Sequence, residues 1–445
     1  MALSLTIAVV TCGVMIASVL FFPKVRIRKF SVDTYWIVVL SGAVVTLAAR
    51  RVDPGFLWSK MTESTSVNPL KILTLFISMT VLSIFLDEVG FFCYLANRAL
   101  SLASHSQTKL FAVLYVTVSL LTVFTSNDIV VLTFTPFICY FAKNANISPK
   151  PYLVAEFVAA NTMSMTFIIG NPTNIYIASS YDVNFVEYAS VMVLPTLAGA
   201  AVAFLVLWLL FRRELKTPAD ASPEEVKIEN KPFLVIGLTV LIICTVVLAI
   251  GSYIGVDMWI AALVSALLLY VLIAIAAAAT GKRPTELGTT LKRAPWQLIP
   301  FVLSMFVIIL ALQENGVTEK IGLLLGEEQT VFRYGVSSFL AANLINNIPM
   351  SVLFCPVIRP LSEGASGAVL SRAVYATIVG SNIGAYLTSN IGAYLTPIGA
   401  LAGIMWMSLL KKHEVKFGYL DFIKYGAVVA VPTLISVLSI LALTI

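Results

Sequence analysis

Apolar positions fill stretches of about 20 residues along the whole chain, with short polar stretches between them. An α-helix rises 1.5 Å per residue, so such a stretch is long enough to cross roughly 30 Å of hydrocarbon. The pattern predicts an all-α polytopic membrane protein. About ten transmembrane helices are expected, over residues 3–22, 34–49, 71–87, 151–180, 188–211, 232–252, 257–280, 297–313, 372–410 and 420–445.

Two further apolar segments, 110–141 and 331–359, are interrupted midway by polar residues. Arms of about 15 residues span only roughly 22 Å, less than the hydrocarbon thickness. Both segments are therefore predicted to be re-entrant hairpins with polar tips near mid-membrane depth. The residues at the tips are Thr125, Ser126, Asn127 and Asp128 in the first segment, and Asn343, Asn346, Asn347 and Pro349 in the second.

The long spans 151–180 and 372–410 are each broken by residues that a helix tolerates poorly. Glycine relaxes the backbone and proline removes a donor, and polar groups freed in lipid cost several kcal/mol each unless something polar satisfies them. A bound solute, an ion or water is the simplest partner. The breaks are Gly170-Asn171-Pro172-Thr173-Asn174 in the first span, and Gly380-Ser381-Asn382 with Thr396-Pro397-Ile398-Gly399 in the second.

The second break contains a tandem repeat, because the sequence of residues 381–388 recurs without change at 389–396. Only one of Asn382 and Asn390 can match the first break, and the sequence leaves open which one does.

The order of helix, acidic glycine turn, hairpin and broken helix occurs twice, which predicts two repeats, 1–211 and 232–445. The charged segment 212–231 between them is the expected linker. Each repeat has an odd number of spans, so the second should insert upside down relative to the first, as in many secondary transporters. Lysine and arginine in alternate loops place the linker in the cytoplasm and both termini outside.

Composition excludes several classes of protein. With 59% hydrophobic and 12% charged residues, the chain is not a soluble globule. The net charge of +6 comes from basic residues in short loops, which insertion rules explain, so no nucleic-acid partner is expected. We find no metal-ligand spacing, nucleophile motif or nucleotide loop, which predicts no enzyme, no cofactor and no bound metal. The driving energy must then come from an ion gradient or a separate ATPase subunit.

Asp128 is the expected proton-coupling group, because a buried acid is costly in a membrane and usually serves an ion or proton path. Glu156 lies early in its span, where a second proton site is one reading, but it is expected instead to reach water at the cytoplasmic surface. Neutral amides, hydroxyls and freed backbone groups are suited to holding a cation or a polar solute. The predicted binding set is Ser126, Asn127, Asp128, Gly170, Asn171, Thr173, Asn174, Asn346, Asn347, Ser381, Asn382, Asn390 and Thr396.

From about residue 86 to the C-terminus, the chain resembles the ion transporter superfamily, and within it most closely the arsenite efflux permeases of the ArsB type. The stretches that carry the resemblance are 86–92, Asn127-Asp128 with Leu132, Thr135 and Pro136, 187–193, 293–297, 346–349 and 395–402. The resemblance implies a scaffold domain and a moving transport domain in the inner membrane. It also implies proton uptake in exchange for neutral As(III) or Sb(III) species leaving the cell.

Other functions remain open at this point. An organic or inorganic anion coupled to Na⁺ or H⁺, or a Na⁺/H⁺ antiporter, would suit the same superfamily. A gated channel could use the same tips as a filter. The partners expected are a small polar solute or anion and the lipid bilayer, and a homodimer is also left open.

Overall fold

The computed structural model describes residues 1–22, 24–27, 30–63, 68–103, 106–217, 228–251, 253–384, 401–415, 417 and 419–445. The predicted all-α polytopic membrane fold is confirmed, since almost every described element is a helix. Seven of these helices are long and apolar enough to cross a membrane.

The helices of the N-terminal half agree closely with the predicted spans. The predicted span 151–180 is divided into two helices by the expected break. Several short helices were not predicted. Their bounds are α1 Ala2–Phe21, α2 Thr34–Ala48, α3 Pro54–Thr62, α4 Pro69–Glu88, α5 Phe91–Ala103, α6 Gln107–Phe124, α7 Asn127–Asn144, α8 Lys150–Met163, the 3₁₀ turn η1 Ile168–Gly170, α9 Pro172–Ser180, α10 Phe185–Phe211 and the 3₁₀ turn η2 Glu214–Lys216.

The C-terminal half contains a matching series of helices. Their bounds are α11 Lys231–Gly251, α12 Met258–Thr280, α13 Thr285–Arg293, α14 Leu298–Glu314, α15 Val317–Leu325, α16 Thr330–Ile345, α17 Asn347–Gly364, α18 Gly367–Gly384, α19 Leu401–Lys412 and α20 Tyr419–Thr444. The predicted break at Gly380-Ser381-Asn382 is wrong, because these residues lie within α18, which continues as a helix to Gly384. Gly380 instead allows close packing against the Gly335 backbone of α16. The other part of the predicted break, 396–399, lies outside the described residues.

The same order of elements occurs in both halves. The helices α4 and α14 each end in glutamate, and a left-handed glycine follows, Gly90 with φ 82° and Gly316 with φ 69°. A short amphipathic helix comes next, then two helices that meet at a polar tip, then a helix interrupted or ended among asparagines. The division into the repeats 1–211 and 232–445, and their opposite orientation in the membrane, stay predictions.

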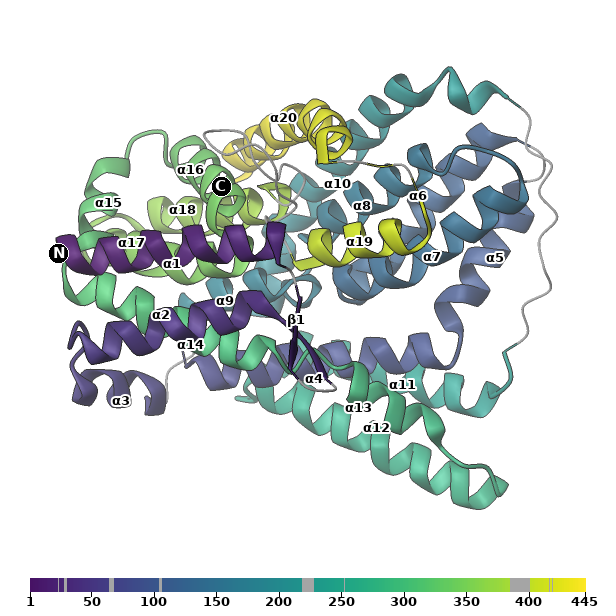
Figure 1. The fold of residues 1–445 in the computed structure, drawn as a ribbon, viewed down its shortest axis with the longest axis horizontal. Coiled ribbons are helices and arrows are strands. Elements are labelled where there is room, and N and C mark those ends of the chain that lie inside the picture. Colours follow the sequence, from purple (N-terminus) through teal and green to yellow (C-terminus); the bar gives the residue numbers. More distant parts are fainter. Residues whose placement is uncertain are drawn as a thin grey trace.

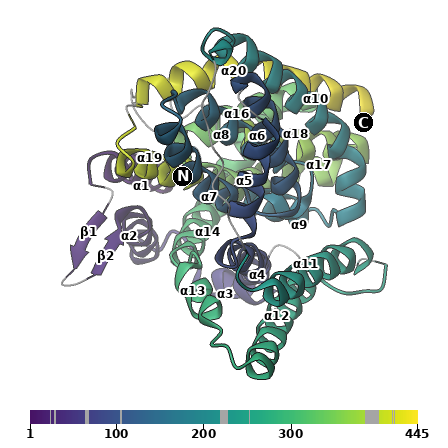
Figure 2. The same ribbon diagram turned by 90° about the vertical axis from the view of Figure 1, so that its right-hand side faces the viewer.

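The helices form two layers (Figures 1 and 2). One layer contains α2, α4, α11, α12, α13 and α14, with α4 packed against α12 and α14 against α2. The other layer contains α5 to α10 and α15 to α20, in which α16 packs against α18 and α10 against α20. Every residue of α8 from Pro151 to Met163 is buried, as is α18 from Ala373 to Gly384, so these two helices form the centre of the second layer.

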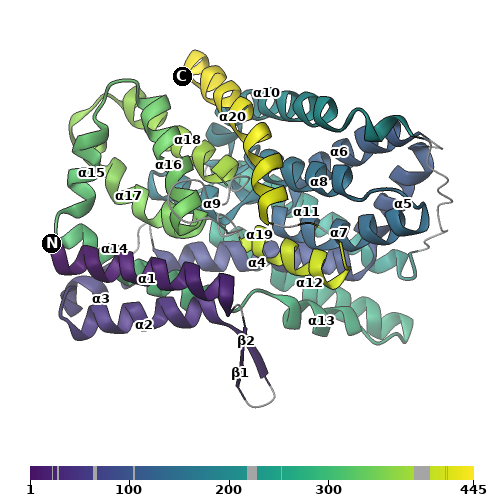
Figure 3. The same ribbon diagram turned by 45° about the horizontal axis from the view of Figure 1, so that its top comes forward.

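One element was not predicted at all. Strands β1 (Lys24–Ile27) and β2 (Phe30–Asp33) pair antiparallel in a short hairpin that projects from the helical body (Figure 3). Alternating basic and apolar residues in this segment suit a strand at least as well as the loop that the charge pattern suggested.

Candidate functional site

The tip of the first hairpin is formed where α6 ends at Phe124 and α7 begins at Asn127. Thr125 and Ser126 are both extended, so the two helices are joined without an intervening loop. Each arm has 18 residues, which is longer than the sequence suggested. The Asn127 side chain is buried and donates a hydrogen bond of 3.1 Å to Oδ1 of Asn161 in α8.

The first helix break lies between α8 and α9. Asn171 caps α9, since its Oδ1 accepts from the backbone N and the hydroxyl of Thr173 at 3.2 and 3.1 Å. Asn174 Nδ2 donates to the freed backbone oxygen of Ser164 at 2.8 Å. A side chain at Gly170 would come within 2.4 Å of the same backbone oxygen, so glycine is required for this turn to close. The freed backbone is thus satisfied from within the break.

Asn382 of α18 joins the second half of the chain to this break. Its Oδ1 accepts from Ser164 Oγ and from Asn171 Nδ2, both at 2.9 Å, and its Nδ2 donates to Asn174 Oδ1 at 2.6 Å. Of the two repeat copies, Asn382 is therefore the one seen to contact the first half. Asn390 and Thr396 lie outside the described residues.

We call the resulting set the amide network. Its members are fully or almost fully buried, and none carries a charge. They are Asn127, Asn161, Ser164, Asn171, Thr173, Asn174 and Asn382.

The tip of the second hairpin has an unusual backbone at Asn346. Its φ of 77° lies in the left-handed region, which asparagine tolerates better than most residues, and its Oδ1 accepts from the Ile348 amide at 3.1 Å. Asn347 begins α17 and is 4% exposed. Helix α17 packs against α9, and Tyr181 just after α9 donates to the Cys355 backbone oxygen of α17.

Several buried polar atoms at the two tips and in α18 have no hydrogen-bond partner among the described residues. Most buried polar groups in proteins are paired, so these atoms are available to a hydrophilic occupant. The atoms are Ser126 Oγ, Asn127 Oδ1, Asn343 Oδ1, Asn347 Oδ1 and Ser381 Oγ. All but Asn343 belong to the predicted binding set.

Asp128 is at the first tip but faces away from the amide network. It lines a cavity of about 340 Å³ between α7 and the first layer, together with Phe76 and Thr80 of α4 and residues 292–297. The structure thus separates the predicted coupling acid from the predicted neutral binding groups, because consecutive residues of a helix point in different directions.

Arg293 beside this cavity connects several elements. Its guanidinium lies 2.6 Å from Asp87 Oδ2 and also forms an ion pair with Glu88, at the end of α4. Asp87 Oδ1 in turn accepts a hydrogen bond of 2.7 Å from Thr133 of α7. The first hairpin is therefore hydrogen-bonded to the first layer through Asp87.

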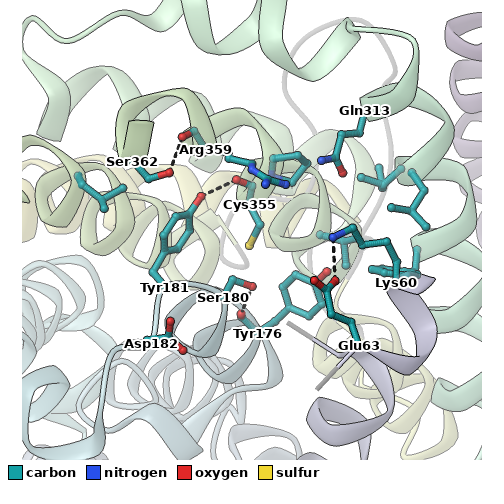
Figure 4. A pocket seen from close by; sticks show the side chains of 16 residues that line it. Lys60, Glu63, Tyr176, Ser180, Tyr181, Asp182, Gln313, Cys355, Arg359 and Ser362 are labelled. Carbon is teal, nitrogen blue, oxygen red and sulfur yellow. Dashed lines mark hydrogen bonds and ion pairs between the residues drawn. The ribbon is translucent and has the colours of Figure 1, made fainter. Parts of the chain in front are cut away.

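A second cavity, of about 450 Å³, lies between the second hairpin and the first layer (Figure 4). Lys60 and Glu63 extend into it from the α3 region, 2.7 Å apart, opposite Arg359 of α17. The hydroxyl of Tyr181 donates to the backbone oxygen of Cys355 across its wall. The two cavities are related by the repeated order of elements, since one borders α7 and the other borders α17.

The expectation that Glu156 reaches water is wrong. Glu156 is 2% exposed, and Thr135 Oγ1 lies 3.1 Å from each of its carboxylate oxygens. The error arose because α8 starts inside the body of the protein, where other helices surround its first turns.

Asn161 and Ser164 were missed as candidate site residues. Asn161 lies in the last turn of α8 and Ser164 is its C-cap, and a run of polar residues at the end of an apolar helix would have indicated them. Their partners are far away in the sequence, so the hydrogen bonds themselves could not be foreseen.

Comparison with known proteins identifies relatives. The model of the citrate transporter (CitMHS) family matches residues 3–380. The arsenical pump membrane protein of Escherichia coli (strain K12) is 26% identical over 426 residues, covering 90% of this chain and 92% of the relative. The silicon efflux transporter LSI3 of Oryza sativa subsp. japonica is 26% identical over 213 residues, 46% of this chain and 44% of the relative.

A solved structure has a similar fold. The Alcanivorax borkumensis YdaH transporter aligns over 99% of this chain and 97% of its own with a TM-score of 0.56 and 12% sequence identity. At this identity the likeness concerns the fold alone.

Proposed function

Because the chain belongs to the citrate transporter (CitMHS) family, within the ion transporter superfamily, we propose that it is a secondary transporter that exports arsenite or antimonite in exchange for protons. Membership of this family makes it a multi-pass membrane transporter. The solute, the coupling ion and the direction of transport are the proposed part.

The chemistry of the amide network is the observation that carries this proposal. Its described members offer carboxamide and hydroxyl groups and no charged side chain. As(III) in neutral water is an uncharged trihydroxide, whose hydroxyls both donate and accept hydrogen bonds, as carboxamides do. A citrate trianion would instead need cationic side chains to offset its desolvation.

The names of two relatives are consistent with a transported solute that is a neutral hydroxide. One is an arsenical pump membrane protein and another is a silicon efflux transporter. Silicon in neutral water is also an uncharged hydroxide. A site of neutral donors and acceptors would suit both solutes.

An anion is the second candidate, and one observation favours it. Helices α7, α9 and α17 all begin at asparagine-rich positions of the site, at Asn127, Pro172 and Asn347. Helix N-termini carry a partial positive charge that attracts anions, and transporters with broken helices use them in this way. An organic or inorganic anion of low charge could therefore occupy the same place.

For coupling, we retain Asp128 as a proton-binding group. Its carboxyl lines the cavity between α7 and the first layer, where an ion entering from one side of the membrane could reach it. The two layers suit a scaffold and a moving transport domain, with the two cavities at their boundary. In this scheme the second layer carries the solute past α4 and α14.

The experiment that tests the proposal is transport into everted inner-membrane vesicles of a host that lacks its own arsenite exporter. We expect accumulation of arsenite and antimonite when the vesicle interior is acidified, and no accumulation of citrate. Collapse of the proton gradient should abolish accumulation. Citrate uptake without arsenite uptake would overturn the neutral-solute proposal. Uptake driven by a sodium gradient would show that Na⁺, and not H⁺, is the coupling ion.

The same vesicles test the proposed location and partners. We place the protein in the inner membrane with both termini outside, and we propose that no ATPase subunit is needed. If ATP depletion stops transport while the proton gradient is held constant, a separate ATPase must be part of the system. A homodimer would be detected by the mass of the detergent-purified protein.

A further inference from the structure

Glu156 of α8 is a carboxylic acid that the scheme above does not use. It is 2% exposed and belongs to the same helix as Asn161 and Ser164 of the amide network. An ionised carboxylate at membrane depth is costly, so an acid held there usually marks an ion or proton path. Its surroundings indicate what it could bind.

The Thr135 hydroxyl of α7 is the hydrogen-bond donor that reaches this carboxyl group. Thr135 Oγ1 lies 3.1 Å from both carboxylate oxygens but can donate to only one of them at a time. In the described part of the chain, no lysine, arginine or histidine forms an ion pair with Glu156. Within the described residues the ionised carboxylate thus has a hydrogen bond from Thr135 but no countercharge.

The ionisable groups on neighbouring helices do not supply a countercharge. The Cys139 thiol of α7 interacts with Glu156, and an ionised thiolate would repel it. Tyr115 of α6 donates instead to the Ala200 backbone oxygen at 2.8 Å. Tyr188 of α10 and Tyr375 of α18 lie against each other near the C-terminal end of α8. Asp421 of α20 forms an ion pair of 3.6 Å with Lys150.

Polar groups continue from Glu156 in both directions. Toward the amide network, the next pair across the interface of α7 and α8 is Asn127 and Asn161. Toward the linker, Tyr152 lies about one turn before Glu156 on α8, and its hydroxyl donates to Gln107 Oε1 at 2.9 Å. Gln107 Nε2 donates to Thr217 Oγ1 at 2.7 Å, at the start of the predicted cytoplasmic linker.

We propose that Glu156 is a second proton-carrying group of the transport cycle, which exchanges its proton with the linker side of the membrane, the side on which Tyr152 and Gln107 lie. The carboxyl O–H bond breaks, the proton passes to water at the linker end, and the carboxylate remains hydrogen-bonded to Thr135. A proton from the opposite side restores the carboxyl group when the transport domain has moved. This inference rests on the proposed proton-coupled export, and Thr135 acts in it as a positioning residue.

The test compares two measurements on purified, reconstituted protein. One is arsenite accumulation driven by a proton gradient, and the other is arsenite counterflow, which needs solute binding and domain movement but no gradient. For Glu156→Gln, we expect the ratio of driven accumulation to counterflow to fall at least about tenfold below that of the unmodified protein. Glu187→Gln, at an exposed acid of α10, is the matched control and should leave the ratio unchanged.

Two conservative variants keep the proposal testable if Glu156→Gln does not fold. Glu156→Asp and Thr135→Val should both displace the pH dependence of driven transport. In Thr135→Val the midpoint of the pH profile should move to higher pH, because the ionised Glu156 carboxylate loses a hydrogen-bond donor. A structural role alone would lower the amount of folded protein and leave the pH profile in place.

The outcomes separate this inference from the proposed function. If the unmodified protein neither accumulates nor exchanges arsenite, the proposed function fails. If the unmodified protein does both, two results overturn the assignment of Glu156. One is an unchanged ratio of accumulation to counterflow in Glu156→Gln. The other is a folded Glu156→Gln protein that loses counterflow together with accumulation. An unchanged pH profile in Glu156→Asp and Thr135→Val would overturn it as well.

Discussion

Asn382 in α18 donates a hydrogen bond of 2.6 Å to Oδ1 of Asn174 in α9, so that a residue of the second half completes the polar network of the first. Asn382 also accepts from Ser164 and Asn171. Every polar atom of its carboxamide is thus used, in a position with no exposure to solvent. The first helix break and α18 are joined through this one side chain.

Replacing Asn382 by alanine should therefore reduce transport strongly. Three buried side chains of the first half would lose a hydrogen bond, and each such loss costs about 1–3 kcal/mol. We expect arsenite counterflow to fall by more than about tenfold, which corresponds to roughly 1.4 kcal/mol. The measurement is initial counterflow rate per folded protein, with Asn97→Ala in α5 as control. Near-normal counterflow would mean that the amide network does not hold the solute.

Replacing Asp128 by asparagine should uncouple transport from the proton gradient. The substituted carboxamide keeps the size of the side chain and one acceptor oxygen but cannot exchange a proton. Gradient-driven accumulation in vesicles is expected to be lost, while downhill movement of arsenite continues. Asp182→Asn, in the turn after α9, serves as a control for the loss of one negative charge. Proton-driven accumulation that survives unchanged would remove Asp128 from the coupling scheme.

The ion pair between Arg293 and Asp87 should contribute modestly to stability. The two side chains are 39% and 12% exposed, so solvent screening reduces the interaction. A double-mutant cycle with Arg293→Gln and Asp87→Asn should give a coupling of about 0.5–1.5 kcal/mol in detergent unfolding. The coupling should decrease in high salt. Strictly additive effects would show that the pair does not form in the folded protein.

Gly380 is required by the close packing of α18 against α16. An added side chain would come within 2.0 Å of Ser338 Oγ and 2.3 Å of the Gly335 backbone oxygen. Gly380→Ala should destabilise the protein by about 1–3 kcal/mol, measured as a lower midpoint of thermal unfolding. Gly288→Ala in α13, where nothing lies within 4 Å, should be neutral or slightly stabilising. Equal effects of the two substitutions would contradict the packing argument.

Deletion of residues 389–396 should leave a folded protein with equal or better activity. The deletion removes the second copy of the repeat and keeps Asn382, which makes the contacts with the first half. Expression in the membrane and arsenite counterflow are the measurements. Complete loss of the protein from the membrane would show that both copies are needed for folding.

The positions of the helices and of the two polar tips could be predicted from the sequence. Long apolar stretches have one stable form in lipid, because only a helix pairs all its own backbone groups there. The predicted span 188–211 corresponds to α10 and the span 257–280 to α12, with ends differing by few residues. The tips were also recognisable, since polar residues interrupting an apolar run are costly and therefore informative.

The sequence could not show in which direction each polar side chain points. Asn127 and Asp128 are neighbours with similar polarity, yet one enters the amide network and the other lines the cavity beside Arg293. Burial of Glu156 depends on helices distant in sequence that surround α8. Such facts follow from packing between elements, which hydropathy does not encode.

The contact of Asn382 with the first helix break has a consequence for folding during synthesis. The N-terminal half is completed first, and until α18 arrives Asn171 and Asn174 lack the partner that Asn382 later supplies. We therefore expect two polypeptides from a gene divided within the linker to accumulate in the membrane more fully when they are made together than when either is made alone.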